Sequence, residues 1–345
     1  MSVKKYFKGF VAGYDFPGRI ADMEEAIGFY TTRAVIASDL EDAEKVCEKL
    51  DIPLRTVNFS SEYWDYVFEY FLNEHKAGRT PNPDILCNTE IKFKAFLDFA
   101  TECGAEKIAT GHYARTDQNN RLLTAIDTNK DQSYFLHGLN EDQLSKSCFP
   151  LGDLEKQQVR QIAQDLDLHI HDKKDSTGIC FIGERKFKTF LEKYIDINQG
   201  NIVDTEGNVL GTHQGITFFT IGQRQGLGIG GLASANDEPW YVIDKNLATN
   251  ELVVAQGSNH PNLFNNSLMI ENMHWINELP KHSLSSIQSK IRYRQPHQDC
   301  HAIESNKQQW RLNFKHPQRA VTPGQYAVLY NGEHCLGGGI ISQRL

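Results

Sequence analysis

The sequence predicts an α/β domain, then a small central domain, then an antiparallel β structure. Up to about residue 196, short apolar runs alternate with segments of helical periodicity, an order typical of a parallel sheet with helices on both faces. Beyond it, turn signals such as Asp204–Asn208 and Asn331-Gly332 separate short β-rich runs. We place the domains at residues 1–196, 197–263 and 264–345. The pattern alone leaves open whether the last is a barrel or a sandwich.

The first half begins with a helix expected over Leu40–Leu50 and a strand over Leu54–Phe59. A second helix starts at Ser60 or Ser61, which can cap it, and ends near Gly78. Its apolar face is expected to hold six side chains: Tyr63, Trp64, Val67, Phe68, Tyr70 and Phe71.

A third helix is expected from about residue 91 to 103, with Phe93, Phe96, Leu97 and Ala100 inward, followed by a buried strand over Lys107–Gly111. Further helices are expected over 141–147, 155–166 and 184–194. Ligands of parallel α/β sheets bind at the carboxyl ends of the strands. The loops after Phe59 and Thr110 therefore form a candidate site.

Composition limits the cellular setting. No apolar run in the 345 residues approaches the 18 needed to span a membrane, and the first residues lack the apolar core of a secretory signal. The seven cysteines are an odd number without a CxxC pair, which argues against a disulfide scaffold and common zinc modules. We therefore expect a cytoplasmic protein without membrane association or bound metal, including at His297–His301, where a zinc site is not favoured.

Charge is unevenly distributed. The net charge of −8 disfavours a nucleic-acid partner, but residues 281–320 contain eight Lys or Arg and four His against only Asp299 and Glu304. A local basic face matters more for phosphate binding than the total does. Charge alone leaves open whether this segment binds a nucleic acid or is a solvated β surface.

The segment Ala77–Lys92 has the highest density of reactive residue types. Two prolines stiffen it, and Asn82, Asp84, Cys87 and Asn88 fall within one or two turns, just before the third expected helix. The helix dipole favours the thiolate of a nearby cysteine, and a carboxylate there can act as acid or base. The same residues can also serve only as a helix cap.

A second cluster, Lys173–Gly183, contains Cys180 between two glycines and downstream of two lysines. Nearby cations lower a thiol pKa, although Cys180 can equally be a buried strand residue. The two cysteines could act as a nucleophile and a resolving thiol. His112 and Lys130-Asp131-Gln132 are weak signals alone, and the glycine-rich segment 222–231 indicates a turn or hairpin rather than a phosphate loop.

Together and in this order, these clusters resemble the bacterial tRNA-specific 2-thiouridylase (MnmA/TrmU) family from about residue 38 to the end. Eight segments carry the resemblance: Gly78–Asn88, Ala109–Tyr113, Lys130–Leu136, Lys174–Gly183, Gly222–Gly231, Pro239–Val242, Arg292–Gln295 and Pro323–Gln325.

The resemblance implies an adenine-nucleotide-hydrolase (PP-loop-like) α/β domain, a small central domain and a C-terminal β-barrel that binds tRNA. It implies ATP-dependent 2-thiolation of the wobble uridine by way of uridine adenylation and a cysteine persulfide. ATP with Mg²⁺, a sulfur-relay donor protein and tRNA would be required, and we expect a monomer.

The family's residue roles fall on the following positions. Cys180 would carry the persulfide, Cys87 would be the nucleophile that forms a transient disulfide with it, and Asp84 would be the acid or base. Asn82, Pro83 and Asp84 would contact the target base, and Gly111 would bind ATP. The residues implied to contact tRNA are His112, Lys130, Asp131, Gln132, Arg292, Tyr293 and Gln325.

One family element has no counterpart here. The Ser-Gly-Gly-x-Asp-Ser loop, whose backbone N–H groups hold the ATP pyrophosphate, is missing, and the dipeptide Ser-Gly does not occur. We therefore expect an α/β domain that is incomplete at its N-terminal end. The alternative function is a non-catalytic or decaying tRNA-binding homologue that has lost this loop.

Overall fold

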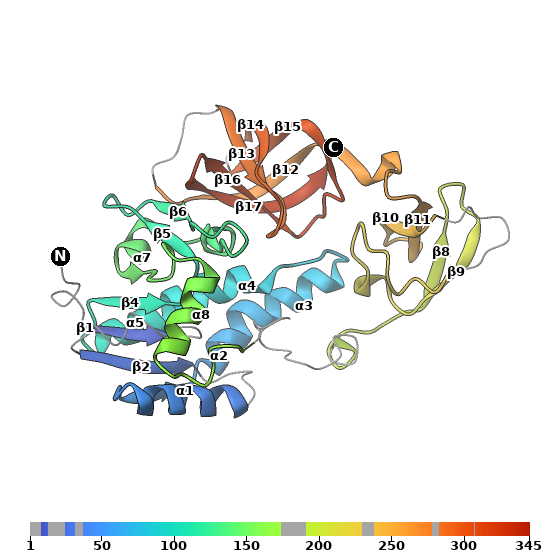
Figure 1. The fold of residues 1–345 in the computed structure, drawn as a ribbon. Coiled ribbons are helices and arrows are strands. Elements are labelled where there is room, and N and C mark those ends of the chain that lie inside the picture. The colour runs from blue at the N-terminus through green and yellow to red at the C-terminus, as the bar shows by residue number, and fades with distance from the viewer. Residues whose placement is uncertain are drawn as a thin grey trace.

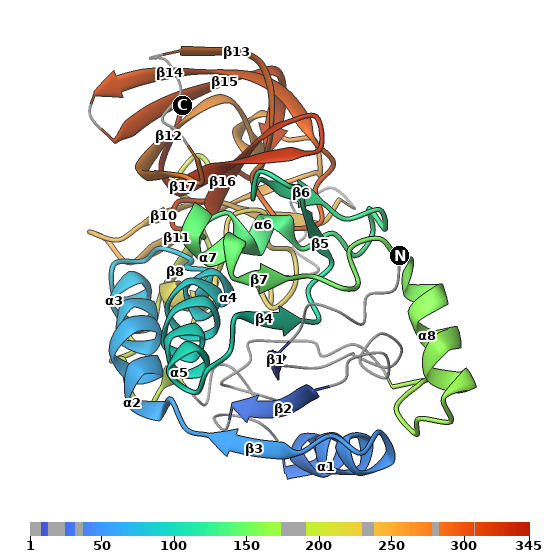
Figure 2. The same ribbon diagram turned by 90° about the vertical axis from the view of Figure 1, so that its left-hand side faces the viewer.

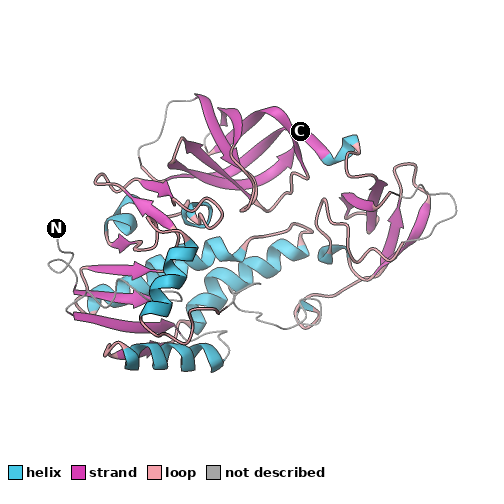
Figure 3. Ribbon diagram, in the orientation of Figure 1, coloured by secondary structure: helices cyan, strands magenta, loops and turns pink. Residues whose placement is uncertain are grey.

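The computed structural model describes residues 8–12, 25–31, 37–173, 191–229, 238–277, 283–306 and 308–345. Three parts follow one another along the chain: an N-terminal α/β domain, a central β domain and a C-terminal β-barrel (Figure 1). Most of the helices belong to the first part, and the other two consist mainly of strands (Figure 3). The α/β class and the antiparallel C-terminal region are as the sequence predicts.

The N-terminal sheet has five parallel strands in the order β3-β2-β1-β4-β7. Its strands are β1 (Lys8–Ala12), β2 (Glu25–Thr31), β3 (Leu54–Val57), β4 (Lys107–Thr110) and β7 (Ser147–Cys148). The chain moves outward from β1 to β2 and β3, then returns to place β4 on the other side of β1. The carboxyl ends of β1 and β4 therefore flank the topological switch point, where α/β sheets bind ligands.

Helices cover both faces of this sheet (Figure 2). On one side, a first helical run joins α2 (Ser60–Tyr63), η3 (Trp64–Phe68) and α3 (Glu69–Lys76). A second joins α4 (Pro83–Leu86), η4 (Cys87–Ala95) and α5 (Phe96–Glu102). On the other side lie α8 (Lys156–Asp165) and, beside β3, α1 (Ala37–Lys49). Two short helices also belong to the domain: α6 (Ser133–Leu136) and α7 (Glu141–Ser145).

Two helix predictions need correction. Trp64 is 41% exposed, while Val67, Phe68 and Phe71 are buried as expected. The segment Trp64–Phe68 is π-helical, so its wider turn shifts the 3.6-residue periodicity that placed Trp64 inward. The third helix starts at Pro83 rather than near residue 91, because Asn82 and Pro83 form a strong N-terminal signal.

The central domain contains a four-stranded sheet in the order β10-β11-β8-β9. Its elements are β8 (Gly200–Val203), β9 (Val209–His213), η5 (Ile216–Phe218), β10 (Trp240–Asn246) and β11 (Glu251–Gln256). The predicted turn at 204–208 joins β8 to β9, and residues 247–250 join β10 to β11. Gly222 and Gly226 have positive φ in a turn segment, as predicted; Gly230 and Gly231 lie outside the described residues.

The C-terminal domain is a closed barrel of β12 (Phe264–Trp275), β15 (Gln309–Arg319), β14 (Gln298–Asn306), β13 (Ser283–Lys290), β16 (Tyr326–Asn331) and β17 (His334–Arg344), preceded by η6 (Pro261–Leu263). Pairing of β12 with β17 closes it, so a barrel replaces the sandwich alternative. The N-terminal domain adds the hairpin β5 (Ala114–Thr116) and β6 (Leu122–Thr124), because Leu123 pairs with His334 of β17.

The N-terminal domain and the barrel share one hydrophobic core. Phe93, Tyr134 and Leu136 of the first domain cluster with Tyr326 and Val328 of β16. A separate cluster fills the barrel interior around Trp310 and Leu312 of β15. Because burial of apolar surface is the main stabilising term, the shared core fixes the barrel against the α/β domain. Among the described residues, no helix is long and apolar enough to cross a membrane.

Candidate functional site

The helix that carries Cys87 begins with a local cap. The Asn82 side chain accepts a hydrogen bond from the backbone N–H of Asp84 at 3.2 Å, and Pro83 occupies the first helical position. Asparagine at the cap and proline next to it favour helix initiation here. Asn82 therefore caps the helix, and Asp84 lies in its first turn. We call the segment Pro83–Ala95 (α4 and η4) the cysteine helix.

Cys87 lies in the second turn of the cysteine helix, not before a helix as the sequence suggested. Its side chain is buried, and the wider π-helical winding starts at this residue. Such turns inside helices often occur at functional sites. The neighbouring Asn88 is also buried, and its amide nitrogen donates to the carbonyl oxygen of Phe135 at 3.2 Å. This bond ties the cysteine helix to α6.

His112 and Gly111 follow β4 directly, at the carboxyl end of that strand. Imidazole Nδ1 of His112 lies 2.9 Å from the Thr110 hydroxyl, and the ring packs 5.6 Å from that of Phe93 in the cysteine helix. Burial, with a smaller contribution from the charge of Lys92, holds the pKa of His112 well below its ordinary value. The imidazole is therefore neutral near pH 7 and can offer hydrogen bonds rather than charge.

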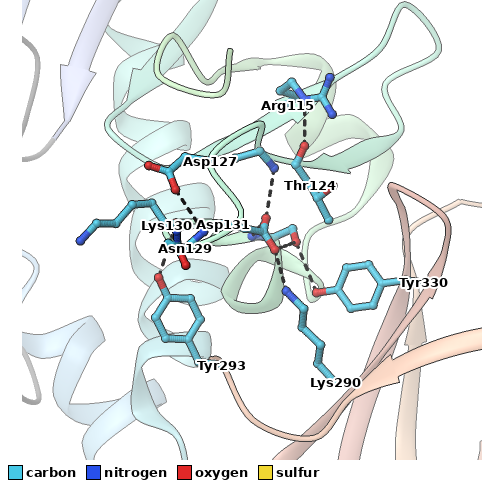
Figure 4. A network of polar contacts seen from close by, with 11 residues as sticks. Arg115, Thr124, Asp127, Asn129, Lys130, Asp131, Lys290, Tyr293 and Tyr330 are labelled. Atoms are coloured by element: carbon cyan, nitrogen blue, oxygen red, sulfur yellow. Dashed lines mark hydrogen bonds and ion pairs between the residues drawn. The ribbon is translucent and has the colours of Figure 1, made fainter. Parts of the chain in front are cut away.

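Asp131 is buried and fully engaged within the protein (Figure 4). Its carboxylate accepts hydrogen bonds from the N–H groups of Ala125 and Ser133, both at 3.2 Å. The second oxygen accepts from the Ser133 hydroxyl at 3.0 Å and pairs with the ammonium group of Lys290 at 2.9 Å. These bonds of the buried Asp131 carboxylate therefore fix the conformation of the segment 130–132.

Lys290 belongs to the barrel strand β13 and is buried, so its ion pair with Asp131 joins two domains. Its ammonium group also lies 5.5 Å from the ring centre of Tyr330, whose hydroxyl is 3.3 Å from that of Ser133. Sequence reasoning missed this residue, because a lysine at the end of a β strand resembles any solvated charge. Its acidic partner, Asp131, is 159 positions away in the sequence, so no local sequence pattern indicates the ion pair.

Gln132 and Tyr293 hold the same segment in place. The side-chain oxygen of Gln132 accepts a hydrogen bond from the backbone N–H of Tyr113 at 2.9 Å. The backbone N–H of Gln132 donates to the carbonyl oxygen of Tyr113 at 2.7 Å. The Tyr293 hydroxyl donates to the Lys130 carbonyl at 3.5 Å, and its ring packs 4.5 Å from that of Phe135 (Figure 4). Tyr293 of the barrel therefore contacts both the 130–132 segment and the neighbour of the cysteine helix.

Arg292 and Gln325 complete the barrel side. The guanidinium of Arg292 donates to the carbonyl oxygens of Arg319 and Ala320 at the end of β15. Its pKa is lowered by burial and by the nearby charge of Arg319. The side-chain amide of Gln325 donates to the carbonyl of Thr80 at 2.7 Å, two residues before Asn82.

The structure thus gathers most of the predicted site residues around the cysteine helix, although they come from two domains. Three contacts do this: Phe93 with His112, Phe135 with Tyr293, and Thr80 with Gln325. Cys180 and the segment 174–183 lie outside the described residues, as does most of the helix expected over 184–194. Among the described residues, no group of three or more His, Cys, Asp or Glu side chains is arranged to hold a metal ion.

Three family models match the chain, one for each structural part. The tRNA methyl transferase HUP domain matches residues 19–184, and the tRNA methyl transferase PRC-barrel domain matches 188–256. The aminomethyltransferase beta-barrel domain matches 265–341. A HUP-type α/β domain followed by two β domains is the architecture described above.

Curated relatives identify the family more narrowly. The tRNA-specific 2-thiouridylase MnmA of Pseudomonas fluorescens is 54% identical over 95% of this chain and 88% of its own length. The proteins of the same name from Shewanella halifaxensis and Psychromonas ingrahamii are 56% and 55% identical, covering 88% and 90% of this chain and 83% and 85% of their own lengths. The chain belongs to the tRNA-specific 2-thiouridylase MnmA family.

Proposed function

We propose that this protein is an ATP-dependent tRNA sulfurtransferase that 2-thiolates the wobble uridine. The observation that carries the proposal is the cysteine helix. Asp84 and Cys87 lie in the first two turns of this helix, and Gly111 and His112, which directly follow β4, lie beside it. The C-terminal barrel is rich in Arg, Lys and His. The names of the curated relatives, all tRNA-specific 2-thiouridylases, support the same substrate and reaction.

In the proposed reaction, ATP adenylates the C2 oxygen of the uridine and pyrophosphate leaves. The terminal sulfur of a persulfide on Cys180 then attacks C2. Cys87 then attacks Sγ of Cys180, and the bond between the two persulfide sulfurs breaks. The base keeps the terminal sulfur, AMP leaves, and a Cys87–Cys180 disulfide forms. The two cysteines are oxidised and the transferred sulfur is reduced, so a thiol reductant must restore them before the next turnover.

Asp84 is proposed as the acid or base of this reaction, with Asn82 and Pro83 beside the target base. All three belong to the capped start of the cysteine helix, whose free N–H groups carry partial positive charge. This end of a helix stabilises negative charge that develops on the base. The burial of Cys87 keeps water from its sulfur.

ATP, with Mg²⁺ as its counter-ion, is proposed to bind at the switch point between β1 and β4. Gly111 directly follows β4, and a residue without a side chain lets the backbone approach a nucleotide closely. The nucleotide would supply the activated leaving group. The proposed domains that divide this work are 1–196 for catalysis, 197–263 as the central unit and 264–345 for tRNA binding.

The tRNA surface is proposed to run from the 130–132 segment to Arg292, Tyr293 and Gln325. Because Asp131 and Gln132 are engaged internally, Lys130 would supply the phosphate contact of that segment, and Asp131 would hold it in position. His112 would offer a neutral imidazole to the nucleotide chain. A sulfur-relay donor protein is the proposed partner, and the enzyme is proposed to act as a cytoplasmic monomer.

Peptide mapping tests the proposed chemistry. After one turnover with unmodified tRNA, ATP and a persulfide donor, digestion without reductant should yield a linked peptide pair containing Cys87 and Cys180. The pair should be absent when ATP is omitted. A non-catalytic homologue that only binds tRNA would retain the RNA but give no linked peptides under either condition.

A further inference from the structure

All three domains meet at one short segment, Ala77–Pro81, which joins α3 to the cysteine helix; we call it the junction loop. From the central domain, Lys245 donates to the carbonyl of Gly78 at 3.1 Å, and the hydroxyl of Thr220 lies 3.4 Å from that of Thr80. A methyl group on Gly78 would meet the side chain of Leu247. The central domain thus contacts the junction loop at two residues, Gly78 and Thr80.

The barrel holds the same loop through two hydrogen bonds. The N–H of Thr80 donates to the carbonyl of Pro323 at 3.2 Å, and the carbonyl of Thr80 accepts from the side-chain amide of Gln325 at 2.7 Å. Both backbone polar groups of Thr80 are therefore satisfied by one segment of the barrel, Thr322–Gln325, which we call the barrel loop. Losing either partner would leave a part-buried peptide group unpaired.

Gly324 allows this close approach. Its φ is +92°, a conformation that favours glycine, and a Cβ there would lie 2.9 Å from the backbone nitrogen of Thr80 and 3.0 Å from Cβ of Arg79. Real Cβ atoms do not approach a backbone nitrogen that closely, so any side chain at 324 would push the junction loop and the barrel loop apart.

The path from Thr80 to Cys87 is short and stiff. Asn82 caps the cysteine helix two residues after Thr80, and Pro81 and Pro83 each fix φ on either side of it. A displacement of Thr80 is therefore passed to the helix start instead of being absorbed by rotation of the backbone. The position of Cys87 depends in this way on the position of the barrel.

We propose that Gly324 is a positioning residue that couples the barrel to the cysteine helix, so that the barrel sets the placement of Asp84 and Cys87 for reaction. The inference rests on the proposed function for the role of those two side chains. Gln325 supports this placement through the bond from its amide nitrogen to the Thr80 carbonyl, in addition to its proposed contact with tRNA.

Gly324→Ala tests the coupling directly, with Gly207→Ala as its matched control. Gly207 has a nearly equal φ of +86°, but a Cβ at this position would meet no heavy atom within 4 Å, so the control carries the same backbone strain without the clash. For Gly324→Ala we expect kcat to fall by about tenfold or more, since displacements near 1 Å can cost about a hundredfold. The Kd for tRNA should stay within about twofold, and the control should match the wild type in both.

Gln325→Ala provides the second arm and introduces no backbone strain. With kcat measured at saturating tRNA, we expect it to fall by about three- to tenfold, the cost of one hydrogen bond to a peptide group. A kcat that is unchanged at saturating tRNA would show that the bond from Gln325 to Thr80 does not help to position the cysteine helix, and would contradict the inference.

A readout without ATP or tRNA separates this inference from the proposed function. The rate at which iodoacetamide alkylates Cys87, followed by mass spectrometry of its peptide, should change several-fold in Gly324→Ala and not in Gly207→Ala. A changed rate in a protein without thiolation activity would overturn the proposed function and keep the coupling. An unchanged alkylation rate together with an unchanged kcat would overturn the coupling.

Discussion

The ammonium group of Lys290 lies 2.9 Å from the carboxylate of Asp131, and both side chains are almost fully buried at the contact between the α/β domain and the barrel. Two N–H groups and the Ser133 hydroxyl complete the coordination of the carboxylate (Figure 4). A buried carboxylate is tolerable only when its charge is compensated in this way. The pair therefore joins the segment proposed to contact tRNA to the barrel that carries the other proposed contacts.

Removing Lys290 should be strongly destabilising. Lys290→Met leaves the charge of Asp131 buried without its cation, which typically costs about 3–5 kcal/mol. The free energy of unfolding, measured by urea denaturation, should fall by that order. The matched control is Lys94→Met, which breaks the exposed pair with Glu90 and should cost under about 1 kcal/mol. Equal effects of the two variants would contradict the structural role of the Lys290 pair.

Cys87 should be essential for thiolation and dispensable for binding. Cys87→Ser removes the thiol that forms the proposed disulfide but keeps nearly the same volume in the buried position. We expect no detectable 2-thiouridine in an activity assay and a tRNA Kd within about twofold of the wild type, since no RNA contact is lost. Cys103→Ser, at the exposed end of α5, is the control and should remain active. Thiolation by Cys87→Ser would remove Cys87 from the mechanism.

Arg292 should contribute to tRNA affinity through charge. Replacing it with alanine should weaken binding and lower the slope of log K against log salt by about one, the signature of one lost phosphate contact. Fluorescence anisotropy with labelled tRNA at several salt concentrations gives both numbers. Arg160→Ala, exposed on α8, should leave the slope unchanged. Affinity that is unchanged in Arg292→Ala would place the RNA elsewhere.

His75 should make the protein sensitive to acid. It is buried against Thr217 of the central domain, and burial, assisted by the charge of Lys245, lowers its pKa to about 4. Between about pH 6.5 and 4 the unfolded chain binds this proton and the folded protein does not. The free energy of unfolding therefore falls as the pH falls through this window, by roughly 3 kcal/mol.

His75→Gln should flatten that pH dependence, measured as the urea midpoint between pH 4 and 7. The exposed His301 on β14 gives the control, and His301→Gln should keep the wild-type slope. His137, whose pKa burial also lowers to about 4, keeps part of the dependence in both variants. A slope unaltered by His75→Gln would show that His75 is not buried in its neutral form.

The sequence predicted what local patterns determine. Apolar runs identified the strands Leu54–Val57 and Lys107–Thr110, and turn signals identified the β-rich character of the C-terminal region. Trp64 was misplaced because periodicity assumes a regular α-helix, and the chain is π-helical there. The start of the cysteine helix was placed too late, although Asn82-Pro83 carried the signal.

Contacts between domains could not be predicted in the same way. The family resemblance named Asp131, Tyr293 and Gln325 as site residues but not their partners within the protein. The pairing of Asp131 with Lys290, and of Gln325 with Thr80, joins positions 159 and 245 residues apart. Such contacts depend on how whole domains pack, which no pattern within a short window of sequence contains.

The most direct measurement is a thiolation assay on this chain with unmodified tRNA, Mg-ATP and a persulfide donor, read as retardation on a mercury-containing gel. A retarded band that requires ATP, and that disappears in Cys87→Ser, is the predicted result. Bound tRNA without a retarded band, with or without ATP, would contradict the proposed sulfurtransferase and favour a homologue that only binds tRNA.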